Sequence, residues 1–498
     1  NVAVGYAAGQ AITSGIQNTL MGGLAGHALT GASSNVALGY EALSTEDTGG
    51  RNIAIGFQAL KTANYDGSAY NTAIGFGAGT LVTTGQQNVL IGGLAGNTLT
   101  EGHSNVAIGM QALEAEDAHG RNIAIGQEAL QTLNAGTHGY NIAMGYQAGH
   151  LMTTGTFNTL IGGFAGDAIT TGTFNTTLGY ATGGAITTGE QNTLIGSLAG
   201  DSLTIGDFNV ALGVHALGTS VDGAHNTAIG YETLKNYEDG DGNGHNTAIG
   251  SKSQLNATTG EFNTSLGSLS MGTGVTTGDY NTAIGNNAGK ILTSGARNVL
   301  VGGLAGDALT TGSSNIAIGM HALSSEDANG NNVAIGDQAL MTLNAGADAY
   351  NVAVGYKAGE AVTTGTANTI LGGLAGDALT TGVGNVIIGE RSSSSQTIAN
   401  YNTSLGQNSL FTNVAGSSNT AIGQGALQAM TSASATNMFN TALGNSSGLA
   451  VTSGVNNTLL GAAAGDALTT GDNNIIIGYT AAASAVDVNN QTVIGVAT

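Results

Sequence analysis

The chain contains no proline, although average usage would place about 25 prolines in a chain of this length. Proline lacks the backbone N–H that a continuous hydrogen-bonded ladder requires, so its absence indicates a backbone that is paired throughout. Cysteine is also absent, which excludes disulfide bonds and thiol chemistry. The ladder must therefore provide the stability that disulfides give to many proteins.

Basic residues are scarce. Lys and Arg together number 9 against 31 Asp and Glu, and the formal net charge is −22 at pH 7. A nucleic-acid-binding surface needs clustered basic side chains, and an anionic membrane surface would repel this chain. The sequence also lacks an apolar run of about 18 residues. We expect no nucleic-acid partner and no membrane insertion by this segment.

A five-residue motif, Asn-x-x-aliphatic-Gly, recurs from Asn1 to a last copy at Gln491, mostly in steps of 17 residues and otherwise of 18 to 21. A fixed period over the whole chain is typical of an elongated solenoid. Glycine every few residues disfavours helices. The sequence predicts an all-β fold: one parallel β-roll (β-solenoid) over residues 1–498, with about 29 coils and two short strands in each coil.

The motif places apolar side chains on both faces of its strand. Counted from the Asn, position 4 is a larger aliphatic residue and position 2 is Thr, Val or Ile, while position 3 is mostly Ala or Leu. A strand that is apolar on both faces is buried on both faces. One face packs inside its own coil, and identical chains are the simplest cover for the other. We therefore expect a homo-oligomer with position 3 at the interface, at Leu20, Leu90, Leu160 and Leu300.

The Asn column is the expected register device. Stacked amides can hydrogen-bond along the ladder, or they can satisfy the backbone of the turns, and the sequence leaves both roles open. The structural ladder begins at Asn1, Asn18, Asn35, Asn52, Asn71 and Asn88.

Four coils form a longer repeat. These units start near residues 1, 71, 141, 209, 281, 351 and 419. The third coil often carries a Glu-Asp pair, as at Glu46-Asp47, and the fourth often ends in a tyrosine, as at Tyr70. Because the pairs recur at the long period, they indicate a solvated wall rather than an acid–base pair.

The runs NTAIGYETL at residues 226–234 and NTAIGNNAG at residues 281–289 resemble two groups of proteins. One is the head repeat of trimeric autotransporter adhesins, and the other is the NTAIGY-type repeat of phage tail fibres. The resemblance covers essentially the whole chain. It implies a left-handed, homotrimeric parallel β-roll.

Three features of the sequence bear on chemistry. GNSSG at residues 444–448 matches a nucleophile elbow, but its first Gly is position 5 of a coil rather than part of a strand-to-helix turn. Asp239, Asp241 and Asn243 resemble half of a calcium loop, with a solvated loop as the alternative. The nine histidines, such as His103, His119 and His138, show no metal-ligand spacing on a common column. We expect no catalytic residue and no cofactor, with calcium as the one candidate ion.

Together these features predict a non-enzymatic extracellular fibre, either a cell-surface adhesin or filament that engages a receptor or glycan, or a virion tail fibre. Columns such as Thr83-Thr84 and Thr153-Thr154 raise a third hypothesis, an ice-binding solenoid. The chain starts at the Asn of a coil, without Met, and its last coil stops early. We expect a processed chain or fragment that continues in further sequence or stacks end to end.

Overall fold

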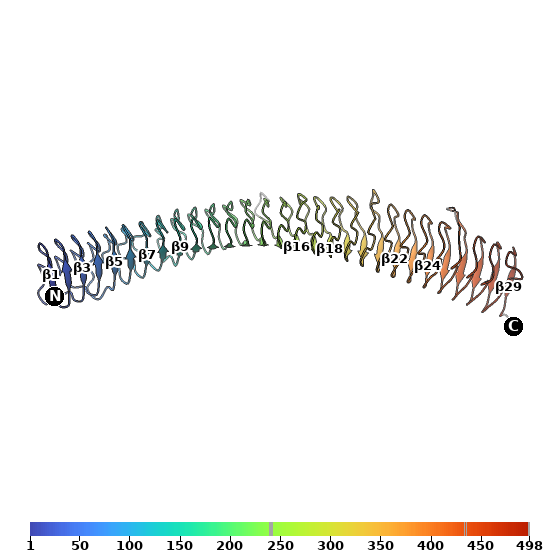
Figure 1. Cartoon of the computed structure of the whole chain (residues 1–498), viewed down its shortest axis with the longest axis horizontal. Helices are drawn as coiled ribbons and strands as arrows, with labels where there is room; N and C mark the ends of the chain where they lie inside the picture. The colour runs from blue at the N-terminus through green and yellow to red at the C-terminus, as the bar shows by residue number, and fades with distance from the viewer. Residues whose placement is uncertain (239–242, 433, 435, 497–498) are drawn as a thin grey trace. The chain divides into compact units, whose positions relative to one another are not determined.

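The computed structural model describes residues 1–238, 243–432, 434 and 436–496. In these residues the chain is all-β, a parallel β-solenoid with 29 three-residue strands, one in each coil, and no helix. The chain divides into two compact units, Asn1–Asn246 and Thr247–Thr498. Figure 1 traces the strands of each unit in chain order. A membrane-spanning helix is not found in the described part of the chain.

The strands of the first unit are β1 (Val2–Val4), β2 (Thr19–Met21), β3 (Val36–Leu38), β4 (Ile53–Ile55), β5 (Thr72–Ile74), β6 (Val89–Ile91), β7 (Val106–Ile108), β8 (Ile123–Ile125), β9 (Ile142–Met144), β10 (Thr159–Ile161), β11 (Thr176–Leu178), β12 (Thr193–Ile195), β13 (Val210–Leu212) and β14 (Thr227–Ile229). Those of the second unit are β15 (Thr247–Ile249), β16 (Thr264–Leu266), β17 (Thr282–Ile284), β18 (Val299–Val301), β19 (Ile316–Ile318), β20 (Val333–Ile335), β21 (Val352–Val354), β22 (Thr369–Leu371), β23 (Val386–Ile388), β24 (Thr403–Leu405), β25 (Thr420–Ile422), β26 (Thr441–Leu443), β27 (Thr458–Leu460), β28 (Ile475–Ile477) and β29 (Thr492–Ile494).

Within each unit, successive strands pair in parallel without a shift of register. For example, Ala73 of β5 lies beside Leu90 of β6, and Ile74 lies beside Ile91. Equivalent positions of the motif therefore form columns that run from coil to coil. Each column repeats at about 4.8 Å, the spacing of neighbouring strands.

The second half of each coil is a series of turns, where the sequence predicted a second strand. Positions 7 and 9 have positive φ angles even when they are not glycine, as at Leu24 (58°) and Leu43 (51°). Such left-handed residues bend the chain away from an extended strand. Hydrogen bonds between coils still pair this half, as where Thr83 N–H donates to Thr100 O at 2.9 Å.

Position 5 shows why the motif ends in glycine. Gly75 has a φ of +143°, and a Cβ built there would lie 2.3 Å from the carbonyl oxygen of Gly92 in the next coil. A side chain is excluded by the backbone conformation and by the close approach of the next coil. The glycine column therefore lets each strand turn sharply into the second half of its coil.

The structure corrects the orientation of the strand. Position 3 faces the interior, and the four proposed interface leucines, Leu20, Leu90, Leu160 and Leu300, are each 0% exposed within the single chain. No partner chain can contact them, so the assignment of position 3 to an interface is wrong. The interior is narrow, which suits the Ala and Leu of position 3, and the larger or β-branched side chains of positions 2 and 4 point outward.

The core of each coil is filled by two columns of complementary size. Position 9 is usually glycine where position 3 of the same coil or of the next coil is large: a Cβ on Gly79 or Gly96 would lie within 3 Å of the Leu90 side chain. Where position 3 is alanine, as at Ala107, a buried leucine commonly fills position 9, as at Leu113. This exchange of volume between the two columns produces the four-coil pattern seen in the sequence.

Candidate functional site

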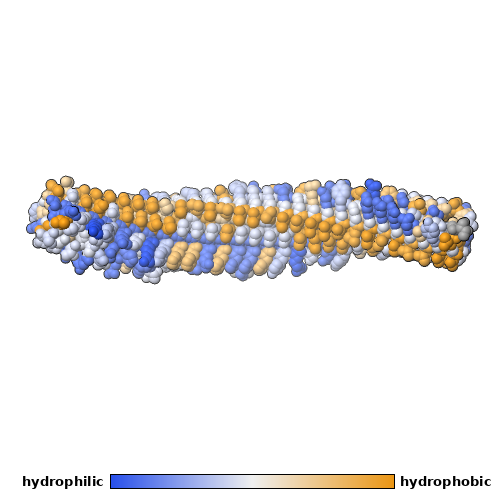
Figure 2. Space-filling model, turned by 90° about the horizontal axis from the view of Figure 1, so that it is seen from below, coloured by the Kyte–Doolittle hydropathy of each residue, from blue (hydrophilic) through white to orange (hydrophobic). Residues whose placement is uncertain are grey.

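The coils jointly build one outward face from their strands. At position 4, Leu178, Leu212 and Leu405 are 43–44% exposed, although they stand in a paired strand. Position 2 contributes a parallel column of Val, Ile and Thr, with Val210 39% exposed. Figure 2 shows apolar rows that continue along the coils. Neighbouring coils cover only part of each side chain, so every coil adds to an unpartnered apolar surface.

A ladder of buried asparagines fixes the register beneath this face. The backbone N–H of Asn105 donates to Oδ1 of Asn88 at 2.9 Å, and Nδ2 of Asn88 donates to Gly102 O at 2.9 Å. The same pattern begins at Asn1, whose Oδ1 accepts from the Asn18 N–H at 2.8 Å. An amide such as that of Asn88 therefore joins two coils and also satisfies a turn carbonyl. The two roles that the sequence left open are performed by one side chain.

Aromatic rings line one border of the outward face, at the last position of the coil, directly before the next Asn. Tyr140 stacks on Phe157 with ring centroids 5.2 Å apart, and Phe157 stacks on Phe174 at 4.9 Å. The Arg121 guanidinium donates to the Tyr140 hydroxyl and lies 5.3 Å from its ring centroid. The faces of stacked rings cover one another, so the column presents ring edges to solvent. It widens the apolar surface and offers few free ring faces for stacking.

The threonine columns of the turns are engaged in the ladder itself. The hydroxyl of Thr83 donates to Thr100 O at 3.2 Å, and that of Thr153 donates to Thr170 O at 3.2 Å. The Thr310 hydroxyl donates to Asp327 O at 2.8 Å. These hydroxyls stabilise neighbouring coils and are therefore already used as hydrogen-bond donors.

The sequence predicted that the Glu-Asp pairs form a solvated wall. The structure corrects this prediction, because the glutamates of the pairs are buried. Glu46, Glu116 and Glu326 are each 0% exposed and stand at position 12, where other coils place an aliphatic side chain. Glu46 Oε1 accepts the N–H of Gly49 at 2.7 Å, which caps the turn. Burial raises the pKa of all three carboxyls above the ordinary glutamate value. The column itself held the sign of burial, since other coils place Leu29, Val82 and Leu99 at this position and all three are buried.

Two acidic side chains and one histidine, Glu116, Asp117 and His119, lie close together at one turn of the first unit. His119 Nδ1 lies 3.7 Å from Glu116 Oε1 and 3.9 Å from Asp117 Oδ1. In the part of the chain that the structure describes, these three form one group whose ligand atoms all lie within 4.8 Å of one another.

Of the proposed calcium ligands, Asp239 and Asp241 lie outside the described residues. Asn243 is described, and its carbonyl accepts the Tyr237 hydroxyl at 3.4 Å.

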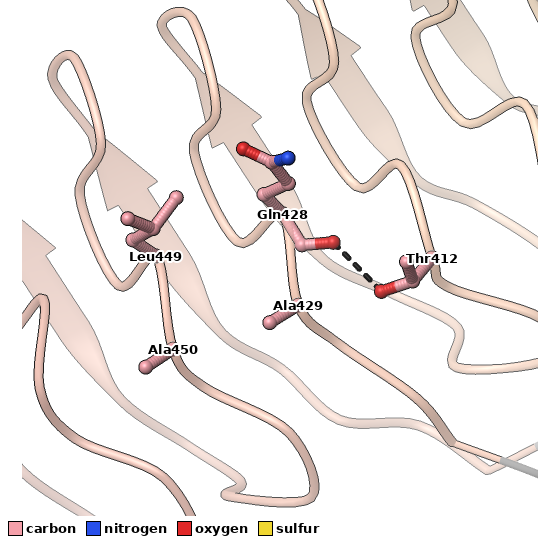
Figure 3. A pocket seen from close by; sticks show the side chains of 5 residues that line it. All are labelled: Thr412, Gln428, Ala429, Leu449 and Ala450. Carbon is pink, nitrogen blue, oxygen red and sulfur yellow. Dashed lines mark hydrogen bonds between the residues drawn. The ribbon is translucent and has the colours of Figure 1, made fainter.

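A hollow in the second unit offers no reactive group. Figure 3 shows the five residues that line it, and the Thr412 hydroxyl donates to the Gln428 carbonyl at 2.7 Å. None of the lining side chains titrates; they are Thr412, Gln428, Ala429, Leu449 and Ala450. The GNSSG motif likewise forms ordinary coil positions, with Gly444 in the position 5 column.

The fold and its outward face define the class of this protein: a parallel β-solenoid with a repeated apolar surface and an asparagine register ladder. Comparison of the chain with protein-family models and with curated proteins finds no match in either.

Proposed function

We propose that this protein is a non-enzymatic extracellular fibre that presents a repeated surface for attachment and assembles from several copies of the chain. The observation that carries the proposal is the outward face, because its apolar side chains are exposed or half-buried in one coil after another. A monomeric protein that stays in solution seldom exposes such a continuous strip. The hollow of Figure 3 and the GNSSG turn supply no nucleophile–base pair, which supports a structural role.

The size of the face suits association between copies. At about 4.8 Å per coil, the 14 strands of the first unit give it a length of about 60 Å. A strip about 8 Å wide then exposes on the order of 500 Å², near the upper end for a typical monomer. The resemblance to trimeric adhesin heads favours three parallel chains and left-handed coils. In this arrangement positions 2 and 4 face the partners.

The same architecture serves a cell-surface adhesin, a filament or a virion tail fibre, and the first is our principal proposal. All three are extracellular, and all use a repeated body to hold a receptor-binding or glycan-binding surface away from its base. A tail fibre is the alternative that the NTAIGY-type resemblance favours. Location of the chain by immunogold labelling, on cells or on virions, distinguishes the two.

Ice binding is a second candidate because threonines also stand on the outward face. Thr159, Thr176 and Thr193 are successive position 2 residues in β10, β11 and β12. A regular array at about 4.8 Å on a flat sheet could order water. The turn threonines do not add to this array, since their hydroxyls bond to carbonyls. Thermal hysteresis of the purified protein decides the question, and its absence rejects ice binding.

The test of the fibre proposal is to place charge on the outward face. Leu178→Lys with Leu212→Lys should reduce self-association by at least about tenfold, because two ammonium groups would be buried at the interface. The matched control is Leu151→Lys, since Leu151 is 47% exposed but stands in the turn half of its coil. Sedimentation equilibrium measures the change. A wild-type protein that stays monomeric, or variants that associate equally, would contradict the proposal.

A further inference from the structure

A polar hollow opens at one turn edge of the first unit. Its volume is about 380 Å³, and small-ligand sites usually measure about 300–1,000 Å³. Four successive coils contribute to it, and the polar side chains in its lining are Gln17, Ser33, Ser34, Thr48, Arg51 and Ser68. The hollow therefore offers hydroxyls, one amide and one guanidinium to a ligand.

Arg51 is the charged residue of the lining, and its charge is not paired within the chain. Its guanidinium donates to the Tyr70 hydroxyl and lies 5.2 Å from the centroid of that ring. Among the described residues, no carboxylate lies within ion-pair distance of Arg51. A guanidinium carries five N–H donors, and its planar fork matches a carboxylate. Arg51 can therefore receive a carboxylate from outside the chain.

A later four-coil unit places a carboxylate of its own at this turn edge. There the equivalent of Ser68 is Asp348, and the equivalent of Arg51 is Asn331. Asp348 Oδ1 accepts the Gly330 N–H at 3.0 Å. The fold can thus seat a carboxylate here. In that unit the chain supplies the carboxylate and lacks the arginine, whereas in the first unit it supplies the arginine and lacks the carboxylate.

The second four-coil unit shows that side chains at the two serine positions face each other. His103 and His138 stand at the equivalents of Ser33 and Ser68. Their rings are in edge-to-face contact, with centroids 5.0 Å apart and planes at 78°. Imidazoles at these positions meet, whereas the two small serines of the first unit leave the hollow open between them.

Hydrogen bonds within the chain hold the oxygen atoms of the lining. The Ser34 hydroxyl donates to Gln17 Oε1 at 3.2 Å, and the Thr48 hydroxyl donates to Asp66 Oδ1 at 2.8 Å. The oxygen of a hydroxyl that donates keeps its lone pairs and can accept from a ligand. The amide nitrogen of Gln17 and the guanidinium of Arg51 supply donors. The lining therefore offers acceptors and donors together.

We propose that this hollow binds a hexuronic acid unit of a glycan. Arg51 pairs with the carboxylate of the sugar, and the hydroxyls and amide of the lining bond to its ring hydroxyls. Each sugar hydroxyl both donates and accepts, which suits such a lining. A single guanidinium in a chain of net charge −22 matches one carboxylate and not a dense polyanion such as nucleic acid. The inference rests on the proposed attachment role, because it names the chemistry of the receptor.

The experiment is a calorimetric titration of the full chain with methyl glucuronide, methyl glucoside and acetate. The glucuronide should bind at least about tenfold more tightly than either of the others, because it alone has both the carboxylate and the ring hydroxyls. Arg51→Asn reproduces the residue found at Asn331 and should remove the preference for the glucuronide over the glucoside. The matched control Arg121→Asn removes the same charge beside Tyr140 and should leave binding unchanged.

A second variant fills the hollow with side chains that the fold already accepts. Ser33→His with Ser68→His reproduces the His103–His138 pair and should weaken glucuronide binding by about tenfold or more. The proposal is overturned if the wild type binds no glucuronide, or binds the glucoside or acetate equally well. It is also overturned if Arg51→Asn keeps the preference, or if the filled variant binds as the wild type does.

Sedimentation of the same samples separates this site from the fibre proposal. A wild-type protein that self-associates but binds no glucuronide overturns the sugar site alone. A protein that binds the glucuronide and stays monomeric supports the site and overturns the assembly.

Discussion

At the scale of the residue, one buried amide carries the register of each coil. Asn88 accepts the N–H of Asn105 and donates to Gly102 O, and its own N–H donates to Asn71 Oδ1 at 3.0 Å. Its removal leaves a donor and an acceptor buried without partners. Each such group costs about 1–3 kcal/mol.

Asn88→Ala should therefore lower the free energy of unfolding by about 2–5 kcal/mol. Asn88→Asp keeps the acceptor but turns a carboxylate oxygen toward Gly102 O, so near neutral pH it should be no more stable than Asn88→Ala. Thr84→Ala, at an exposed position of the preceding coil, is the control. Hydrogen exchange of the amides in β6 and β7 measures the local opening. Equal protection in Asn88→Ala and Thr84→Ala would contradict the ladder role.

The buried Glu326 makes stability depend on pH. Burial raises its pKa above the ordinary 4.5, so the folded state binds this proton more tightly than the unfolded state does. Its contribution is most favourable below pH 4.5 and is lost as the pH rises from 4.5 through the raised folded value. Nδ2 and the N–H of Asn329 both donate to Oε1, and Oε2 has no hydrogen-bond partner among the described residues.

Glu326→Gln should raise the melting temperature at pH 7 and change it little at pH 4. The fold already accepts glutamine at position 12, where buried Gln396 donates to Ala399 O at 3.1 Å. Asp327→Asn changes the exposed neighbour and is the control. The same melting temperature for wild type and Glu326→Gln at pH 7 would show that the buried charge costs nothing.

At the scale of the element, the core is filled jointly by position 3 of one coil and position 9 of the same and the preceding coil. Leu90 occupies the space that Gly79 and Gly96 leave open, whereas the next coil fills its core from the other side with Leu113. The left-handed φ at position 9 is similar for both residue types, 58° at Gly96 and 51° at Leu113. Leucine can therefore replace glycine there when position 3 is small.

Leu90→Ala should cost about 2–5 kcal/mol, because it opens a cavity between two glycines. Gly96→Leu alone should also destabilise the coil, since its side chain meets Leu90. The double variant reproduces the alanine–leucine pair of the next coil and should recover part of the loss. Chemical denaturation of all four proteins gives the coupling energy. Additive losses would mean that the two columns do not share one space.

At the scale of the whole molecule, charge and apolar surface oppose each other. The net charge of −22 repels copies of the chain, while the outward face favours their contact. Salt screens the repulsion, with a Debye length of about 10 Å at 0.1 M, and leaves apolar burial in place.

Self-association should therefore become stronger as sodium chloride rises from about 0.05 M to about 0.5 M. Sedimentation velocity at a fixed protein concentration measures the shift. The variant that carries Leu178→Lys and Leu212→Lys should show little gain, because its interface is charged. Association that weakens with salt would indicate ion pairs between chains and would argue against the apolar face.

The sequence by itself determined the period, the position of the first strand in each coil and the asparagine column. These features depend on local spacing: Asn and Gly bracket three residues of alternating direction in every copy. The absence of proline belongs with them, since the ladder needs every N–H. The resemblance to adhesin heads and tail fibres added the prediction of a parallel β-roll. The described residues do form a parallel β-solenoid.

Only the tertiary structure decided which side of the strand faces inward. Alternation leaves Leu90 and Ile91 on opposite sides, and both are apolar, so the pattern alone cannot choose. The left-handed residues of the second half-coil set the direction in which the chain closes, and this closure buries position 3. The size exchange between positions 3 and 9 was the signal in the sequence that could have shown it.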